Sequence, residues 1–97
     1  MPKAYVIFTE AIHDQDGMRA YETASTAPIV ESGARVLAVD AGRPLEGEWH
    51  GDRTVLLEFD SVEAAQAWYD SPAYQAAAPL RHAAATTNAI ILAGFGA

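Results

Sequence analysis

Residues 54–69 read TVLLEFDSVEAAQAWY, and this stretch decides the fold because it sets a strand directly before a helix. Residues 54–59 are of strand length and rich in β-branched and aromatic side chains. Ser61 is a preferred helix cap, and the run that follows it to Tyr69 carries apolar side chains at helical spacing. The stretch therefore predicts a strand that leads into an amphipathic helix.

The chain downstream predicts a second helix and a last strand. Ser71 followed by Pro72 is typical of a helix start, with the serine as cap and the proline in the first turn. This helix is expected to reach about Ala85, with a kink at Pro79. Residues 88–93 (NAIILA) then predict a closing strand.

The chain upstream predicts a strand, a helix and a second strand. Residues 4–9 (AYVIFT) predict the first strand, and either Asp14 or Asp16 is expected to cap the helix that follows. This helix is expected to bend near Pro28 and to end at Gly33. The remaining segments are a second strand and a hairpin-like excursion, over residues 35–39 and 40–52.

The order β-α-β-β-α-β predicts an α+β fold of the ferredoxin-like kind, in which a four-stranded antiparallel sheet carries its helices on one face. A length of 97 residues leaves room for a single domain over residues 1–97. The helix-free face would be wet in a monomer, so the strands should alternate apolar and polar side chains. They do not, because apolar groups point to both sides of the predicted strands. We therefore expect a homodimer through the helix-free sheet face, the alternative being a different protein partner.

The composition predicts an acidic protein of the cytoplasm. The formal net charge is −7, and the six Lys and Arg are too scattered to favour nucleic-acid binding. There is no Cys for disulfides or nucleophilic catalysis, and residues 1–5 do not resemble a leader. No apolar run approaches the roughly 20 residues that span a membrane. No metal or cofactor is expected, since His13 and His50 have no second ligand at metal-binding spacing.

A Trp-Tyr pair shortly before Ser-Pro, followed by Tyr and Gln, occurs at residues 68–75 (WYDSPAYQ). The further residues that carry a resemblance are Ala4-Tyr5-Val6-Ile7, Tyr21, Gly33, Leu45-Glu46-Gly47, Trp49, Arg53, Glu58-Phe59, Ser61 and Arg81. With these residues the chain resembles a small, mainly bacterial family catalogued as domain of unknown function 1330, in the dimeric α/β-barrel group.

The resemblance implies the fold and the dimer, and it implies no reaction. Asp60 and Ala73 depart from the Pro and Glu that the family usually has, and the missing Glu removes one candidate carboxylate. Proteins of this architecture include cofactor-free monooxygenases, small-molecule isomerases and haem-binding enzymes, which is a likeness of fold alone.

Glu58 is the candidate catalytic residue. A carboxylate within an apolar strand must be paired or have a raised pKa, and a raised pKa suits a general base. The alternatives are an ion pair with an arginine or an outward-facing edge position. The arginines considered for that ion pair are Arg35, Arg53 and Arg81.

Five residues are candidates for ligand binding: Tyr21, Trp68, Tyr69, Arg81 and His82. The three aromatic residues suit the walls of a small apolar pocket, or plain core packing. Arg81 lies on a stripe of the last helix that is expected to face inward, where it could clamp a carboxylate, or satisfy Glu58 or a helix C-terminus. His82 could ligate haem iron, shuttle a proton or lie in solvent.

The sequence predicts a small-molecule-binding protein or a cofactor-independent enzyme that acts on a compact apolar acid. In the enzyme, Glu58 would be the base and Arg81 the anchor. A non-catalytic regulatory or stress-related binding module is the alternative, and haem binding is a third. The sequence does not decide whether the protein is an enzyme.

Overall fold

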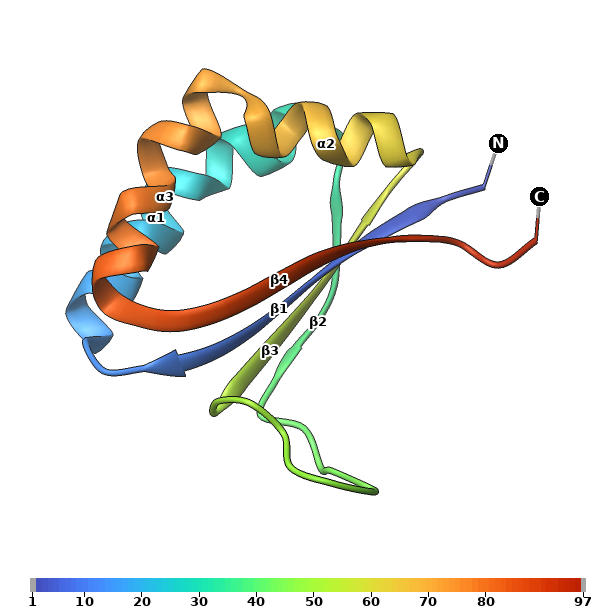
Figure 1. Cartoon of the computed structure of the whole chain (residues 1–97). Coiled ribbons are helices and arrows are strands. Elements are labelled where there is room, and N and C mark those ends of the chain that lie inside the picture. Colours follow the sequence, from blue (N-terminus) through green and yellow to red (C-terminus); the bar gives the residue numbers. More distant parts are fainter. Residues whose placement is uncertain (1, 97) are drawn as a thin grey trace.

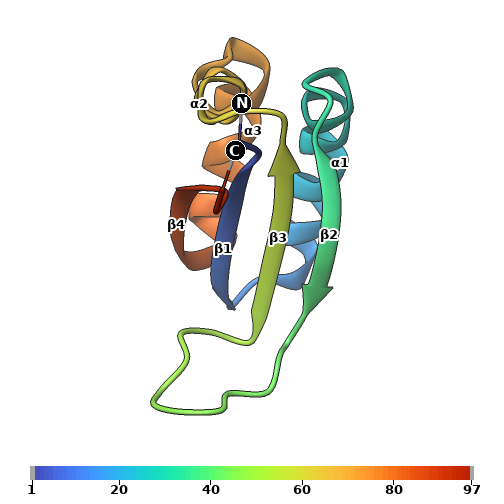
Figure 2. The ribbon, with the colours of Figure 1, turned by 90° about the vertical axis from the view of Figure 1, so that its right-hand side faces the viewer.

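The computed structural model describes residues 2–96 and shows a four-stranded sheet with its helices on one face (Figure 1). The elements in chain order are β1 (Ala4–Ile12), α1 (Gln15–Glu31), β2 (Arg35–Asp40), β3 (Arg53–Phe59), α2 (Val62–Asp70), α3 (Pro72–Ala84) and β4 (Ala85–Ala93). The strands lie in the order β2-β3-β1-β4, and each neighbouring pair is antiparallel (Figure 2). The predicted ferredoxin-like fold is confirmed.

Side-chain caps hold the helix starts where the sequence predicted them. Asp14, rather than Asp16, accepts a hydrogen bond from the backbone N of Gly17 at 3.0 Å. Ser61 and Ser71 accept in the same way at the starts of α2 and α3, at 3.0 and 3.1 Å. The hydroxyl of Ser71 also donates to the last turn of α2, so one residue ends one helix and begins the next.

The central strand β1 and the edge strand β4 are longer than predicted. They extend by residues 10–12 and 85–87, respectively, beyond the predicted segments. The two strands pair continuously from Ala4 opposite Ala93 to Ile12 opposite Ala85. Ladder hydrogen bonds therefore keep polar residues such as Thr86 in the strand, and α3 ends at Ala84.

The core between the helices and the sheet is built from aromatic rings and alanines. Ring centroids lie 4.2 Å apart for Trp68 and Tyr74 and 5.2 Å apart for Trp68 and Phe59. The stripe of α3 that was predicted to face inward is buried: Tyr74, Ala77, Arg81 and Ala84. No helix within residues 2–96 is long and apolar enough to cross a membrane.

A loop over residues 41–52 joins β2 to β3 and sweeps sideways along the end of the sheet (Figure 2). Its return is tied to β1, because the backbone N of Asp52 donates to the carbonyl of Glu10 at 2.8 Å and its Oδ1 accepts from the N of Ile12 at 3.1 Å. It is also tied to β4, where His50 Nε2 lies 2.9 Å from the carbonyl oxygen of Thr86. The loop is thus fixed against β1 and β4.

Gly51 is the residue at which this loop meets β1, and Gly47 at the loop tip is its natural control. Both have positive φ, of 81° and 72°, but a Cβ on Gly51 would overlap the backbone of Glu10, whereas one on Gly47 meets nothing within 4 Å. We expect Gly51→Ala to destabilise the protein by clearly more than the roughly 1 kcal/mol expected for Gly47→Ala. Urea unfolding measures both, and equal losses would contradict the close approach.

Candidate functional site

A hollow of about 170 Å³ opens between α1 and the helix-facing side of the sheet. Its wall is largely apolar, with Phe8 and Tyr21 at its inner part and Val36 and Val39 of β2 among the rest. Its polar lining includes Glu10, Arg53 and Glu22. The hollow therefore combines an apolar wall with a charged patch, as small-molecule sites commonly do.

The charged patch is an ion-pair bridge from the sheet to α1. Glu10 of β1 is 1% exposed, and its Oε1 accepts from Arg53 Nε at 2.8 Å. Arg53 Nη1 donates to Glu22 of α1, also at 2.8 Å. Burial lowers the pKa of Arg53, but the hydrogen bonds to Glu10 and Glu22 outweigh it, so the pKa is raised. The guanidinium of Arg53 is therefore charged at neutral pH.

Two tyrosine hydroxyls meet beside this hollow. The Oη atoms of Tyr21 on α1 and Tyr74 on α3 lie 2.7 Å apart, and the rings contact edge to face. Burial raises the pKa of Tyr21 well above its usual value, the neighbouring Tyr74 adds to the rise, and Arg81 opposes it. Both tyrosines can thus share one hydrogen bond while the accepting hydroxyl keeps its own proton to donate.

Arg81 is a buried cation without an acidic partner. It is 3% exposed on α3, and its guanidinium carbon lies 4.9 Å from the ring centre of Phe8 and 5.7 Å from that of Tyr21. Within residues 2–96 it forms no ion pair, and its Nε has no hydrogen-bond partner. The guanidinium has one long polar contact, with 3.4 Å between Nη2 of Arg81 and Nε2 of His82. Burial lowers the pKa of Arg81, yet Tyr74 and Tyr21 raise it, and the net shift is upward.

Two further buried polar atoms share this interior without hydrogen-bond partners among the described residues. They are Trp68 Nε1 on α2 and Thr87 Oγ1 on β4. Thr87 lies directly opposite Glu10 in the ladder, and Trp68 packs on Phe8 with ring centroids 6.3 Å apart. Buried polar groups are normally satisfied, so these three atoms are exceptional in this core.

The structure brings three of the five predicted ligand-binding residues together. Tyr21, Trp68 and Arg81 all surround Phe8 and Tyr74 in the interior. Tyr69 is half-buried and packs on Trp68 and Tyr74 from the outer side of α2.

His82 is placed apart from this interior. It is exposed on α3. Haem binding requires an axial His on the pocket side, and this placement does not supply one.

Glu58 lies on the opposite face of the sheet. It alternates with Leu57 and Phe59, which are buried against the helices, so it must point to the helix-free side. Arg35, its partner across the β2–β3 ladder, donates from Nε to its Oε1 at 2.6 Å. This hydrogen bond, aided by one from Tyr5, lowers the pKa of Glu58. The raised pKa expected of a base is therefore wrong, and within one chain Glu58 does not meet Arg81.

Sequence reasoning missed Glu10, Arg53 and Thr87. Glu10 keeps the alternation of the buried Val6 and Phe8, so a predicted strand one residue longer would have placed it inside. Arg53 was considered as a partner of Glu58, whereas the ladder sets it opposite Glu10.

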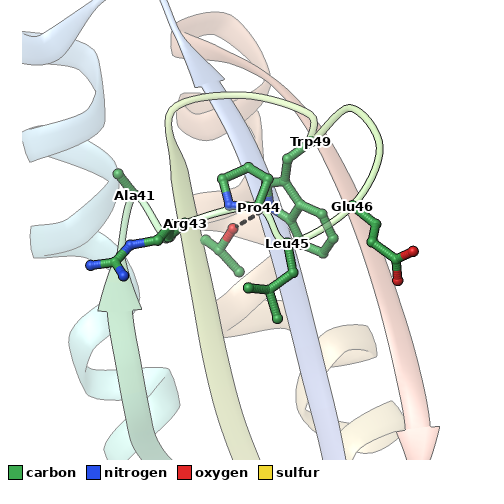
Figure 3. A pocket seen from close by; sticks show the side chains of 8 residues that line it. Ala41, Arg43, Pro44, Leu45, Glu46 and Trp49 are labelled. Carbon is green, nitrogen blue, oxygen red and sulfur yellow. Dashed lines mark hydrogen bonds between the residues drawn. The ribbon is translucent and has the colours of Figure 1, made fainter.

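A second hollow, of about 430 Å³, lies under the loop of residues 41–52 (Figure 3). Pro44, Leu45 and Trp49 form its apolar part, and the indole Nε1 of Trp49 donates to Thr54 Oγ1 at 2.8 Å. Within residues 2–96, no group of three His, Asp or Glu side chains is placed to hold a metal ion.

Comparison with known proteins gives a family and a fold. A family model described as domain of unknown function (DUF1330) matches residues 3–95. No curated protein matches the chain significantly. Among solved structures, the RPA0582 protein of unknown function from Rhodopseudomonas palustris is similar with a TM-score of 0.76 and 20% identity, over 99% of this chain and 85% of that one.

Two other solved structures illustrate the range of similar proteins. A dimeric ferredoxin-like protein of unknown function from Thermobifida fusca has a TM-score of 0.63 and 18% identity, over 95% of this chain and 91% of that one. The cofactor-independent oxygenase SnoaB from Streptomyces nogalater has a TM-score of 0.72 and 8% identity, over 100% of this chain and 97% of that one. At these identities the likeness is one of fold.

The titration of Glu58 tests its placement. Because Arg35 lowers the pKa of Glu58, their pairing contributes stability above the usual Glu pKa and loses it as the pH falls through the lowered value. We expect Arg35→Gln to return the pKa of Glu58 towards its usual value, and Arg43→Gln in the exposed loop to leave it unchanged. Side-chain NMR titration measures both, and a pKa of Glu58 that ignores Arg35→Gln would contradict the ion pair.

Proposed function

The chain belongs to the DUF1330 family, and we propose that it binds a compact apolar acid between its helices and its sheet, with Arg81 as the anchor of the acid group. The observation that carries this proposal is the unpaired burial of Arg81. An unpaired buried charge costs several kcal/mol, which folding must offset elsewhere. An anionic ligand would supply the missing partner.

The atoms left free on Arg81 suit a carboxylate. A guanidinium binds a carboxylate through two parallel N–H donors, and Nε of Arg81 has no partner within the described residues. The spare hydroxyl proton of the Tyr21–Tyr74 pair is a further donor in the same interior. The site therefore offers both a cation and a neutral donor to an anion.

The surroundings of Arg81 set the body of the ligand. Phe8, Tyr21 and Trp68 are aromatic walls. Phe8 and Tyr21 also line the hollow beneath α1, and they separate it from Arg81, which is not one of its lining residues. A hollow of about 170 Å³ is smaller than the usual range of ligand pockets. A small, flat or compact apolar molecule with one acid group fits these limits.

Within this proposal we assign any proton transfer to Glu10 and not to Glu58. Glu10 lines the same hollow as Tyr21, and Arg53 holds one of its oxygens in place. General-base catalysis requires a positioned carboxylate within reach of the proton that it removes, and Glu10 is preferred to Glu58 because it lies on the helix side of the sheet. The fold shared with a cofactor-independent oxygenase is compatible with such chemistry, and a binding module without turnover would use the same contacts.

Benzoate and its neutral analogue benzamide test the anchor. In a Trp49→Phe background Trp68 is the remaining indole, and we expect benzoate to change its fluorescence and benzamide to bind at least about tenfold more weakly. Arg81→Met should abolish benzoate binding while raising the stability of the free protein by roughly 1–4 kcal/mol, because it removes an uncompensated charge. Calorimetry and urea unfolding check both.

The control for this test is Arg19→Met, which removes an exposed arginine of α1 paired with Asp16. It should bind benzoate as the parent does. Equal binding of benzamide and benzoate, or unchanged binding by Arg81→Met, would show that Arg81 does not anchor an acid.

We also propose that the chain forms a homodimer through its helix-free sheet face. Ile90 and Leu92 of β4 are 52% and 45% exposed there, and the ladder sets them beside Ile7 and Tyr5 of β1. These residues form a continuous apolar surface that no helix covers, of the kind that marks an interface. Several proteins of similar fold are described as dimeric, which supports a second copy as the cover.

A charge placed on this face should separate the copies. We expect Ile90→Asp to yield a folded monomer, since the aspartate would be buried twice across a two-fold interface. Leu80→Asp, at a 39% exposed position of α3, should remain a dimer. Sedimentation velocity and native mass spectrometry measure the mass, and a dimer that survives Ile90→Asp would place the interface elsewhere.

A further inference from the structure

We infer that the loop of residues 41–52 is a clasp for the second copy, and that apolar side chains of that copy fill the hollow formed by Pro44, Leu45 and Trp49. This inference rests on the proposed homodimer. It adds an interaction surface outside the strands and commits the hollow to a protein occupant.

The loop stands on the helix-free face. Thr54 alternates with Val55, which lines the hollow beneath α1, so its hydroxyl points away from the helices. Trp49 binds that hydroxyl at 2.8 Å, which holds the indole on the same side. Figure 3 shows the loop in front of the strands with the helices behind them.

The loop is fixed in this position. Asp52 is bound to both Glu10 and Ile12 of β1, and His50 reaches the carbonyl of Thr86 on β4. A surface held by hydrogen bonds to two strands is already shaped before a partner arrives. Such preorganisation lowers the entropic cost of association.

The exposed side chains of the loop are those that interfaces bury. Leu45 is 93% exposed and Trp49 is 53% exposed, although both are large apolar residues. A copy seated on the helix-free face would lie beside the loop, because Thr54 holds Trp49 on that side.

The charge of the loop indicates which part of the second copy fills the hollow. The loop carries Arg43 against Glu46, Glu48 and Asp52, so one positive and three negative charges give a net charge of −2. Two loops of like charge repel each other, which disfavours direct contact between them. The apolar sheet surface of the second copy is not repelled in this way, so we assign it to the hollow.

Trp49 reports on the clasp. In a Trp68→Phe background it is the remaining indole, and we expect its emission to be blue-shifted in the dimer and to shift to the red on dilution to monomer. Leu45→Ser should weaken dimerisation by roughly tenfold or more, because each dimer loses two buried leucines. Val30→Ser, at a 69% exposed position of α1, is the matched control and should leave the dimer unchanged.

The outcomes separate this inference from the dimer itself. A wild-type monomer at all concentrations would remove both. A dimer in which Trp49 stays solvent-exposed and Leu45→Ser has no effect would keep the dimer and overturn the clasp. Should Trp68→Phe fail to fold, sedimentation of Leu45→Ser against Val30→Ser in the wild-type background gives the same decision.

Discussion

The pairing of β1 on both of its edges is the constraint on which the rest of the molecule depends. β3 and β4 are bonded to it along almost its whole length, so its backbone cannot rotate and its side chains must alternate between two faces. The helix side of β1 therefore carries Val6, Phe8 and Glu10. The opposite side carries Tyr5 and Ile7. One strand thus supplies both a charged interior site and an apolar outer surface.

The interior that results is not optimised for stability. Arg81 is buried beside the tyrosine pair, and polar atoms of Trp68 and Thr87 are also buried without partners among the described residues. A leucine at position 81 would fill this core of aromatic rings and alanines without burying a charge. This cost is the reason why we propose a ligand site here.

The fold was predictable because its signals are local. Capping residues such as Ser61 and Ser71, and the β-branched runs, act over a few residues and do not need the tertiary structure. The candidate site was harder. The stripe on α3 correctly placed Arg81 inside, but the partner of Glu58 depended on which strand lies beside β3, and β2 sets Arg35 there. Glu10 was missed because the predicted strand ended at Thr9, whereas pairing with Arg53 of β3 and Thr87 of β4 continues β1 past that residue.

Glu10 has a double role that gives the molecule a route for communication. Its carbonyl oxygen fastens the loop through Asp52, while its carboxylate holds Arg53 in the interior. One residue, Glu10, therefore takes part both in the surface that we assign to the second copy and in the cavity that we assign to the ligand. Thermodynamic reciprocity then applies: whatever factor ligand occupancy adds to self-association, self-association returns to the affinity for the ligand. If both proposals hold, ligand binding and dimerisation would be coupled through Glu10 without the movement of a domain.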